Sequence, residues 1–98
     1  MKYEWDDVKA SKNYKKHGIR FEEAQVIWAD MNSLEFYDDV NLIGEDRFIR
    51  IGLNAKRGVL HVVYTERENG ETIRIISARK ASNSEKAIYE EELRFKIT

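Results

Sequence analysis

Cysteine and proline are absent from this chain of 98 residues, and histidine occurs only twice, at His17 and His61. A chain without cysteine forms no disulfide and offers no thiolate to a metal ion, a composition that suits a reducing cytoplasm. Two histidines without a spacing such as His-Glu-x-x-His do not define a metal site. The sequence also has no P-loop, no glycine-rich dinucleotide fingerprint and no nucleophile elbow. We therefore expect neither a metal ion nor a cofactor.

Long apolar runs are missing as well. No stretch approaches the ~20 apolar residues of a membrane-spanning helix. Residues 1–5 lack the apolar region of a signal peptide. There is no repeat, no low-complexity tract and no proline-rich linker. We predict a single domain over residues 1–98 that works in the cytoplasm, away from membranes.

Charge is nearly balanced overall but segregated along the chain. The net charge of −1 excludes the strongly basic composition typical of many nucleic-acid-binding domains. However, six basic side chains lie between residues 9 and 20 without an acidic one among them. Acidic residues gather instead at 38–39, 45–46 and 90–92. This segregation allows a local basic patch on a nearly neutral protein.

Hydrophobic periodicity and turn residues predict an α+β fold. Helices are expected at about 7–17, 21–30 and 82–94, with Asp6 or Asp7 as the first N-cap, Gly18 as the first stop, and a capping box from Ser82 to Glu85. Strands are expected at 3–5, 34–38, 47–53, 59–66 and 73–81. We predict an antiparallel sheet of about four strands with the two N-terminal helices and the C-terminal helix packed on one face.

Two turns predict the register of the sheet. A two-residue hairpin at Asn69-Gly70 places Tyr64 opposite Ile75, Thr65 opposite Arg74 and Val62 opposite Ser77. A loop over 54–57 places Ile49 opposite Val62 and Ile51 opposite Leu60. One face then collects the apolar residues Ile49, Ile51, Leu60, Val62, Tyr64, Ile73 and Ile75, which the helices cover. The other face collects Phe48, Arg50, His61, Val63, Thr65, Arg67, Arg74, Ile76 and Lys80, with Ser77 and Arg79 near the edge of the apolar face. A shift of one residue inverts these assignments.

Cations in the most β-prone stretch, residues 73–81, point to an anion site. This stretch combines the stiff isoleucines Ile73, Ile75 and Ile76 with three cations, Arg74, Arg79 and Lys80, and the hydroxyl of Ser77. Guanidinium and ammonium groups bind phosphate well and stabilise charge that develops on it. The alternative is that these cations are solvated and pair with neighbouring glutamates, and for Arg67 we favour that alternative.

The run Lys16-His17-Gly18 has two interpretations. Histidine titrates in the range that suits a general base, and Lys16 would add a cation beside it. Basic residues in the last turn also complement the negative end of a helix dipole, and for Lys16 this is the simpler explanation.

A set of short motifs runs through nearly the whole chain, in order: Glu4-Trp5-Asp6, Lys9, Asn13, Lys16-His17-Gly18, Phe21 with Glu22-Glu23-Ala24, Glu45 with Arg47, Val62-Val63-Tyr64-Thr65, Ile73-Arg74-Ile75-Ile76-Ser77-Ala78-Arg79-Lys80-Ala81, Glu85 and Tyr89. In these motifs the chain resembles the BrnT family of toxins, and the resemblance has several implications. It implies a RelE-like fold and a ribonuclease toxin of a type II toxin–antitoxin system that inhibits translation. It also implies neutralisation by a BrnA-type antitoxin. In such a complex only the antitoxin contacts operator DNA, and the complex represses its own operon.

The resemblance and the basic face together give the candidate site. We expect an endoribonuclease without a metal, whose catalytic residues are His17, Glu45, Arg74, Arg79 and Tyr89. We expect RNA binding by Lys16, Arg47, Arg50, His61, Thr65, Arg67, Ser77 and Lys80. Two alternatives remain open: a non-enzymatic module that binds a protein or acidic peptide, and an inactive toxin that serves as a subunit of an autorepressing complex. Dimerisation is expected within the toxin–antitoxin complex, through the antitoxin.

Overall fold

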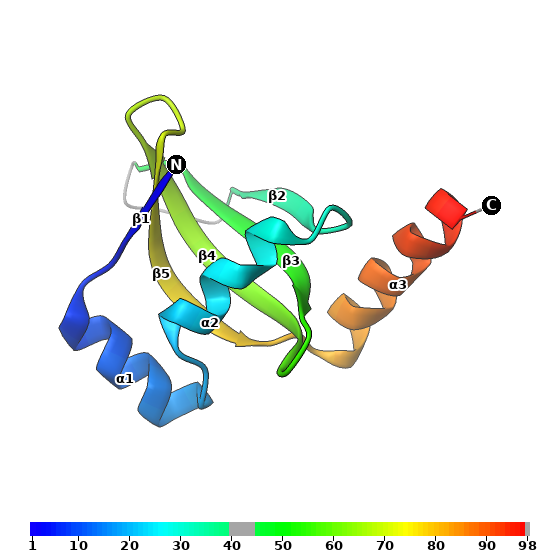
Figure 1. The fold of residues 1–98 in the computed structure, drawn as a ribbon, viewed down its shortest axis with the longest axis horizontal. Helices are drawn as coiled ribbons and strands as arrows, with labels where there is room; N and C mark the ends of the chain where they lie inside the picture. The colour runs from blue at the N-terminus through cyan, green and yellow to red at the C-terminus, as the bar shows by residue number, and fades with distance from the viewer. Residues whose placement is uncertain (40–44, 98) are drawn as a thin grey trace.

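The computed structural model describes residues 1–39 and 45–97 and has the α+β composition that the sequence predicts (Figure 1). The helices are α1 (Asp7–His17), α2 (Phe21–Gln25), the short 3-10 helix η1 (Val26–Ala29) and α3 (Asn83–Ile97). The strands are β1 (Lys2–Glu4), β2 (Leu34–Asp38), β3 (Arg47–Asn54), β4 (Gly58–Arg67) and β5 (Thr72–Lys80). The second predicted helix is therefore shorter than expected, because the chain tightens into η1 at Val26.

The sheet contains five strands in the order β1-β5-β4-β3-β2. The prediction of about four antiparallel strands is wrong in this respect, because β1 joins the sheet parallel to β5, with Tyr3 opposite Ile73. A short N-terminal strand can pair in parallel here because α1 and the rest of the chain separate it from β5 in sequence.

The register between β4 and β5 is as predicted at one end only. Tyr64 lies opposite Ile75 and Thr65 opposite Arg74, as expected. Between Val63 and Tyr64 the register shifts, so that Val62 lies opposite Ala78 and not Ser77. The extra residue on β5 is Ile76, and such a bulge reverses the facing of every residue beyond it.

The register between β3 and β4 differs by one residue from the prediction. Asn54 pairs with Gly58, so the loop has three residues, and Ile51 lies opposite His61 while Ile49 lies opposite Val63. Gly58 adopts a φ of 88°, which is the left-handed conformation that closes three-residue hairpins. Ile49 and Ile51 therefore lie on the same face as His61, whereas Arg50 lies on the opposite one.

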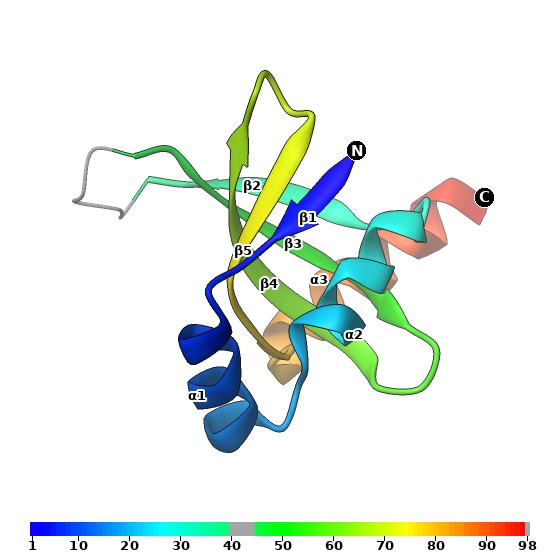
Figure 2. The ribbon, with the colours of Figure 1, turned by 60° about the vertical axis from the view of Figure 1, so that its left-hand side comes forward.

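Helices cover both faces of the sheet, which corrects the prediction of helices on one face (Figure 2). On the first face the core residues Leu60, Val62, Tyr64, Ile73, Ile75 and Ala78 pack against Ile19, Phe21, Ala24 and Ile27 from α2, η1 and the segment before them. On the second face Ile51 and Val59 pack against Tyr89, with Ile49 and Leu93 beside them. The sheet thus forms the middle layer, with α3 on the face that also carries His61.

Asn13 fixes α1 to the edge of β5. Its side-chain Nδ2 donates to the carbonyls of Ile19 at 3.0 Å and Ala78 at 2.9 Å, and its Oδ1 accepts the N–H of Ala78 at 3.0 Å. Asp6 caps the start of the helix, and Gly18, with a φ of 72°, ends it as predicted. The last turn of α1, with Lys16 and His17, is therefore held beside β5.

Candidate active site

The candidate site lies on the second face of the sheet, beside α3. We call this surface the basic face and define it by the side chains of β4 and β5 that share it: His61, Val63, Thr65, Arg67, Arg74, Ser77 and Arg79. Ser77 and Arg79 reach this face only because of the bulge at Ile76. Without that bulge they would point into the core formed with α1 and α2.

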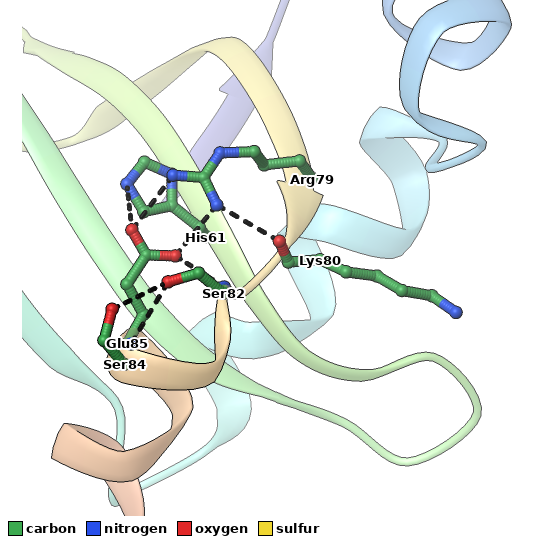
Figure 3. Close-up of polar contacts among 6 residues, drawn as sticks. All are labelled: His61, Arg79, Lys80, Ser82, Ser84 and Glu85. Atoms are coloured by element: carbon green, nitrogen blue, oxygen red, sulfur yellow. Dashed lines mark hydrogen bonds and ion pairs between the residues drawn. The ribbon is translucent and has the colours of Figure 1, made fainter.

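A cluster of His61, Arg79 and Glu85 occupies one end of the basic face (Figure 3). His61 and Arg79 are opposite each other on β4 and β5. The guanidinium of Arg79 donates to both carboxylate oxygens of Glu85, at 2.8 and 2.9 Å. The Nε2 atom of His61 lies 3.6 Å from Oε2 of Glu85. One carboxylate therefore holds the arginine in a fixed orientation and contacts the imidazole as well.

The start of α3 positions Glu85. Glu85 Oε1 accepts the N–H of Ser82 at 2.8 Å, and the N–H of Glu85 donates to Ser82 Oγ at 3.2 Å. This is the capping box that the sequence predicts, in which each residue satisfies a backbone group at the helix start. The same carboxylate that caps α3 thus orients Arg79, so the helix and the cluster depend on each other.

The cluster sets the protonation states of its members. The hydrogen bonds from Arg79 lower the pKa of Glu85 to about 2, so this carboxylate is ionised near neutral pH. Burial and then the charge of Arg79 lower the pKa of His61, and Glu85 offsets this only in part. His61 is therefore neutral near pH 7. A neutral imidazole beside a fixed guanidinium can accept a proton while the cation stabilises a phosphate.

Arg74 and Arg67 form the other end of the basic face. Arg74 lies 3.5 Å from Glu4 of β1, and Arg67 lies 3.7 Å from Glu4 and 3.6 Å from Glu45. These side chains are a third to a half exposed, so the pairs contribute little to stability and can exchange a carboxylate for a phosphate. At this end, opposite Arg74, also lies Thr65 of β4, whose buried hydroxyl has no hydrogen-bond partner among the described residues.

Lys16 and His17 lie in a shallow hollow between α1 and β5. The hollow has a volume of about 230 Å³ and is lined by Lys9, Lys12, Asn13, Lys16, His17, Ile76 and Ser77. Ser77 belongs to both the hollow and the basic face. Since Ser77 and Arg79 are two residues apart on one strand, the hollow begins about 7 Å from the base of Arg79 along β5.

Two predicted RNA-binding residues, Arg50 and Lys80, are not on the basic face. The side chain of Arg50 lies over the ring of Trp28, 5.0 Å from its centroid, and bonds Ser33 at 2.8 Å and Glu35 at 3.2 Å. Lys80 is opposite Leu60, and its side chain points away from the cluster (Figure 3). Their predicted placement is wrong because the three-residue loop and the bulge each change the register by one.

Tyr89 and Arg47 lie at the margins of the second face. Tyr89 belongs to α3 and is buried where that helix packs against Ile51 and Val59, and its hydroxyl donates to Asp30 at 2.6 Å. Burial and this bond raise the pKa of Tyr89. Arg47 begins β3, opposite Asp38, and its buried Nε has no hydrogen-bond partner among the described residues. Neither residue is part of the cluster around Glu85.

Glu85 and Glu4 are the members of the site that the sequence analysis did not assign to it. Glu85 is recognisable in the sequence as the partner of Ser82 in a capping box, but that pattern says nothing of a second contact with Arg79. Glu4 reaches Arg74 only because β1 pairs with β5 in parallel. Both contacts depend on tertiary structure, for which the local sequence carries no signal.

No group of three or more His, Asp or Glu side chains in residues 1–39 and 45–97 is placed to hold a metal ion. No helix in this part of the chain is both long and apolar enough to cross a membrane.

Comparison with known proteins defines the class of this chain. A family described as the ribonuclease toxin, BrnT, of type II toxin-antitoxin systems matches residues 5–85. The match spans most of the chain, so the protein is a ribonuclease toxin of a type II toxin–antitoxin system by family. The chain belongs to the BrnT family.

A solved structure supports the same assignment. The fold is similar to the crystal structure of the Brucella abortus ribonuclease toxin BrnT, with a TM-score of 0.66 and 25% sequence identity. The similarity covers 85% of this chain and 99% of that one. No curated protein sequence matches the chain.

Proposed function

We propose that the chain is an endoribonuclease that needs no metal and binds its RNA substrate across the basic face. The observation that carries this proposal is the cluster in which Glu85 holds the guanidinium of Arg79 beside a neutral His61. Arg79 and Arg74 would bind the scissile phosphate and stabilise the charge that develops on it. Lys16, Arg47, Thr65, Arg67 and Ser77 would contact neighbouring parts of the RNA.

The reaction that suits these groups uses the 2′-hydroxyl of RNA as the nucleophile. A neutral histidine removes the hydroxyl proton, O2′ forms a bond to phosphorus, and the bond from phosphorus to the 5′-oxygen breaks. A protonated histidine returns a proton to that oxygen, which leaves a 2′,3′-cyclic phosphate and a 5′-hydroxyl. The two histidines lie on either side of β5, His61 on β4 and His17 on α1, and can divide these roles. Glu45 and Tyr89 remain predictions as further proton carriers.

The biological role we propose is inhibition of translation through RNA cleavage, with neutralisation by a BrnA-type antitoxin. Membership of a type II toxin–antitoxin family supports an antitoxin partner. Within the complex, the antitoxin would bind operator DNA and bring two toxin chains together.

Expression in a bacterial host without an antitoxin tests this function. We expect the native protein to arrest growth and the Arg79→Ala variant to lose this effect by at least tenfold in viable counts. Lys15→Ala is the matched control, because Lys15 is an exposed cation outside the basic face and the α1 hollow. Co-expression of a BrnA-type antitoxin should restore growth. Harmless expression of native protein at a verified level would contradict the proposal.

One observation favours a different function. The arginines Arg67, Arg74 and Arg79 all have carboxylate partners already, the last of them in a bidentate pair. Because these carboxylates neutralise the arginines, the surface also suits an inactive toxin that only binds the antitoxin as a subunit of a repressor. A chain that is harmless alone, yet forms a stable complex with the antitoxin, would support this second candidate.

A further inference from the structure

The hollow between α1 and β5 differs in charge from the rest of the molecule. Three lysines line it, Lys9, Lys12 and Lys16, together with His17. No carboxylate of the described residues lies within 4.0 Å of the three ammonium groups. By contrast, the arginines of the basic face are paired with Glu4, Glu45 or Glu85. The hollow therefore holds cations that form no ion pair with the part of the chain that the structure describes.

The placement of these lysines follows from how α1 docks. Lys9, Lys12 and Lys16 recur at the spacing of one helical face, and Asn13 lies on that same face. The side chain of Asn13 forms hydrogen bonds with the backbone of Ala78, so this face of α1 points toward β5. A helix face turned toward a sheet edge usually carries apolar side chains. In α1 this face carries three exposed lysines, and packing against the sheet does not explain their presence.

The dipole of α1 does not create this site. The hollow includes His17, at the C-terminal and negative end of the helix, where an anion is disfavoured by the backbone. Attraction of an anion must therefore come from the lysines themselves. The chain between Val8 and Ile19 supplies them without a single acidic residue.

The hollow is continuous with the basic face through Ser77. A strand of RNA whose scissile phosphate lies at Arg79 would carry its next phosphates along β5 toward Ser77 and the lysines. We propose that the hollow is a binding subsite for phosphodiester groups of single-stranded RNA that flank the cleaved bond. This inference rests on the proposed ribonuclease function, and it adds Lys9 and Lys12 to the RNA contacts.

The test measures binding separately from cleavage. The full chain is titrated into a fluorescent single-stranded RNA in which every 2′-hydroxyl is methylated, so that it cannot be cut, at several salt concentrations. Each phosphate contact on a single strand contributes about 0.7 to the slope of log K against log salt. We expect the slope for the Lys9→Gln/Lys12→Gln variant to be shallower than that of the native protein by about 1.4, because two phosphate contacts are lost. The control variant Lys15→Gln/Lys56→Gln removes the same charge from exposed positions outside the hollow and should keep it.

Each outcome decides the inference. Equal losses in both variants would overturn it, since they would show attraction to net charge alone. An unchanged slope in Lys9→Gln/Lys12→Gln, or no binding by the native protein, would overturn it too. If the two variants differ in their salt slopes for duplex DNA but not for RNA, the hollow binds DNA and the RNA subsite is rejected. If the native protein shows this contrast in binding but cuts unmethylated RNA neither alone nor in a translating extract, the hollow stands as an RNA-binding site and the proposed ribonuclease function fails.

Discussion

Arg79 and Glu85 are six positions apart in the chain, yet they meet because β5 ends and α3 begins between them. The sequence identified Arg79 and His61 as candidates from their chemistry. It could not place them together, because the run Ile75-Ile76 reads as continuous strand and hides the bulge. The same limit applies to Arg50, whose side chain lies over the ring of Trp28 and donates a hydrogen bond to Glu35. The chemistry of these candidate residues was therefore predictable, whereas the contacts that they make beyond the bulge and the three-residue loop were not.

Glu85 should stabilise the folded chain in a pH-dependent way. The variant Glu85→Gln removes the charge but keeps a side chain that can cap α3, so we expect a loss of about 1–2 kcal/mol in the free energy of unfolding at pH 7. Since the pKa of Glu85 is lowered from 4.5 to about 2, the carboxylate stabilises the fold above pH 4.5, and this is lost as the pH falls toward 2.

Urea unfolding of both proteins at pH 7 and pH 3 measures this effect. The difference between native protein and Glu85→Gln should shrink at pH 3. Glu90→Gln is the control, because Glu90 is exposed and has only Lys86 at 4.0 Å, so its effect should stay below about 0.5 kcal/mol. A constant difference at the two pH values would show that Glu85 acts through packing and not through its charge.

At the scale of single elements, local signals predicted the capped ends of α1 and α3 well and the sheet register poorly. Asp6, Gly18 and the pair of Ser82 and Glu85 end or begin helices as expected, because capping depends on neighbours in sequence. Register depends on the exact length of a turn, and the loop after Asn54 is one residue shorter than predicted. One residue was enough to exchange the faces of Ile49 and Arg50.

The attachment of α1 to β5 depends on Asn13. The variant Asn13→Ala leaves the N–H and carbonyl of Ala78 without their side-chain partners, so we expect it to lower the free energy of unfolding by about 2–3 kcal/mol. Amide hydrogen exchange in α1 should accelerate more than exchange in β3. Ser11→Ala, at an exposed position of the same helix, should change stability by less than about 0.5 kcal/mol. Uniform acceleration across the sheet and α1 would show that Asn13 supports the whole fold and not this contact.

At the scale of the whole molecule, the α+β class was predictable from periodicity, whereas the arrangement of layers was not. The apolar faces of α1 and α2 and of α3 look alike in sequence, and nothing in them says which side of the sheet each covers. The structure places α3 on the face that carries His61, so its first turn can complete the cluster with Glu85. The basic face is therefore bounded by α3. The RNA path that we propose runs from the cluster of His61, Arg79 and Glu85 along β5 toward α1.

The most direct test of a ribonuclease centre on the basic face is cleavage of a defined RNA by the purified protein in the presence of a chelator. The comparison is an Arg74→Ala/Arg79→Ala variant whose fold is confirmed by circular dichroism, and both proteins are tested on free RNA and in a translating extract. We predict cleavage by the native protein alone, with 2′,3′-cyclic phosphate ends. Equal cleavage by both proteins, or cleavage by neither in both settings, would contradict the account.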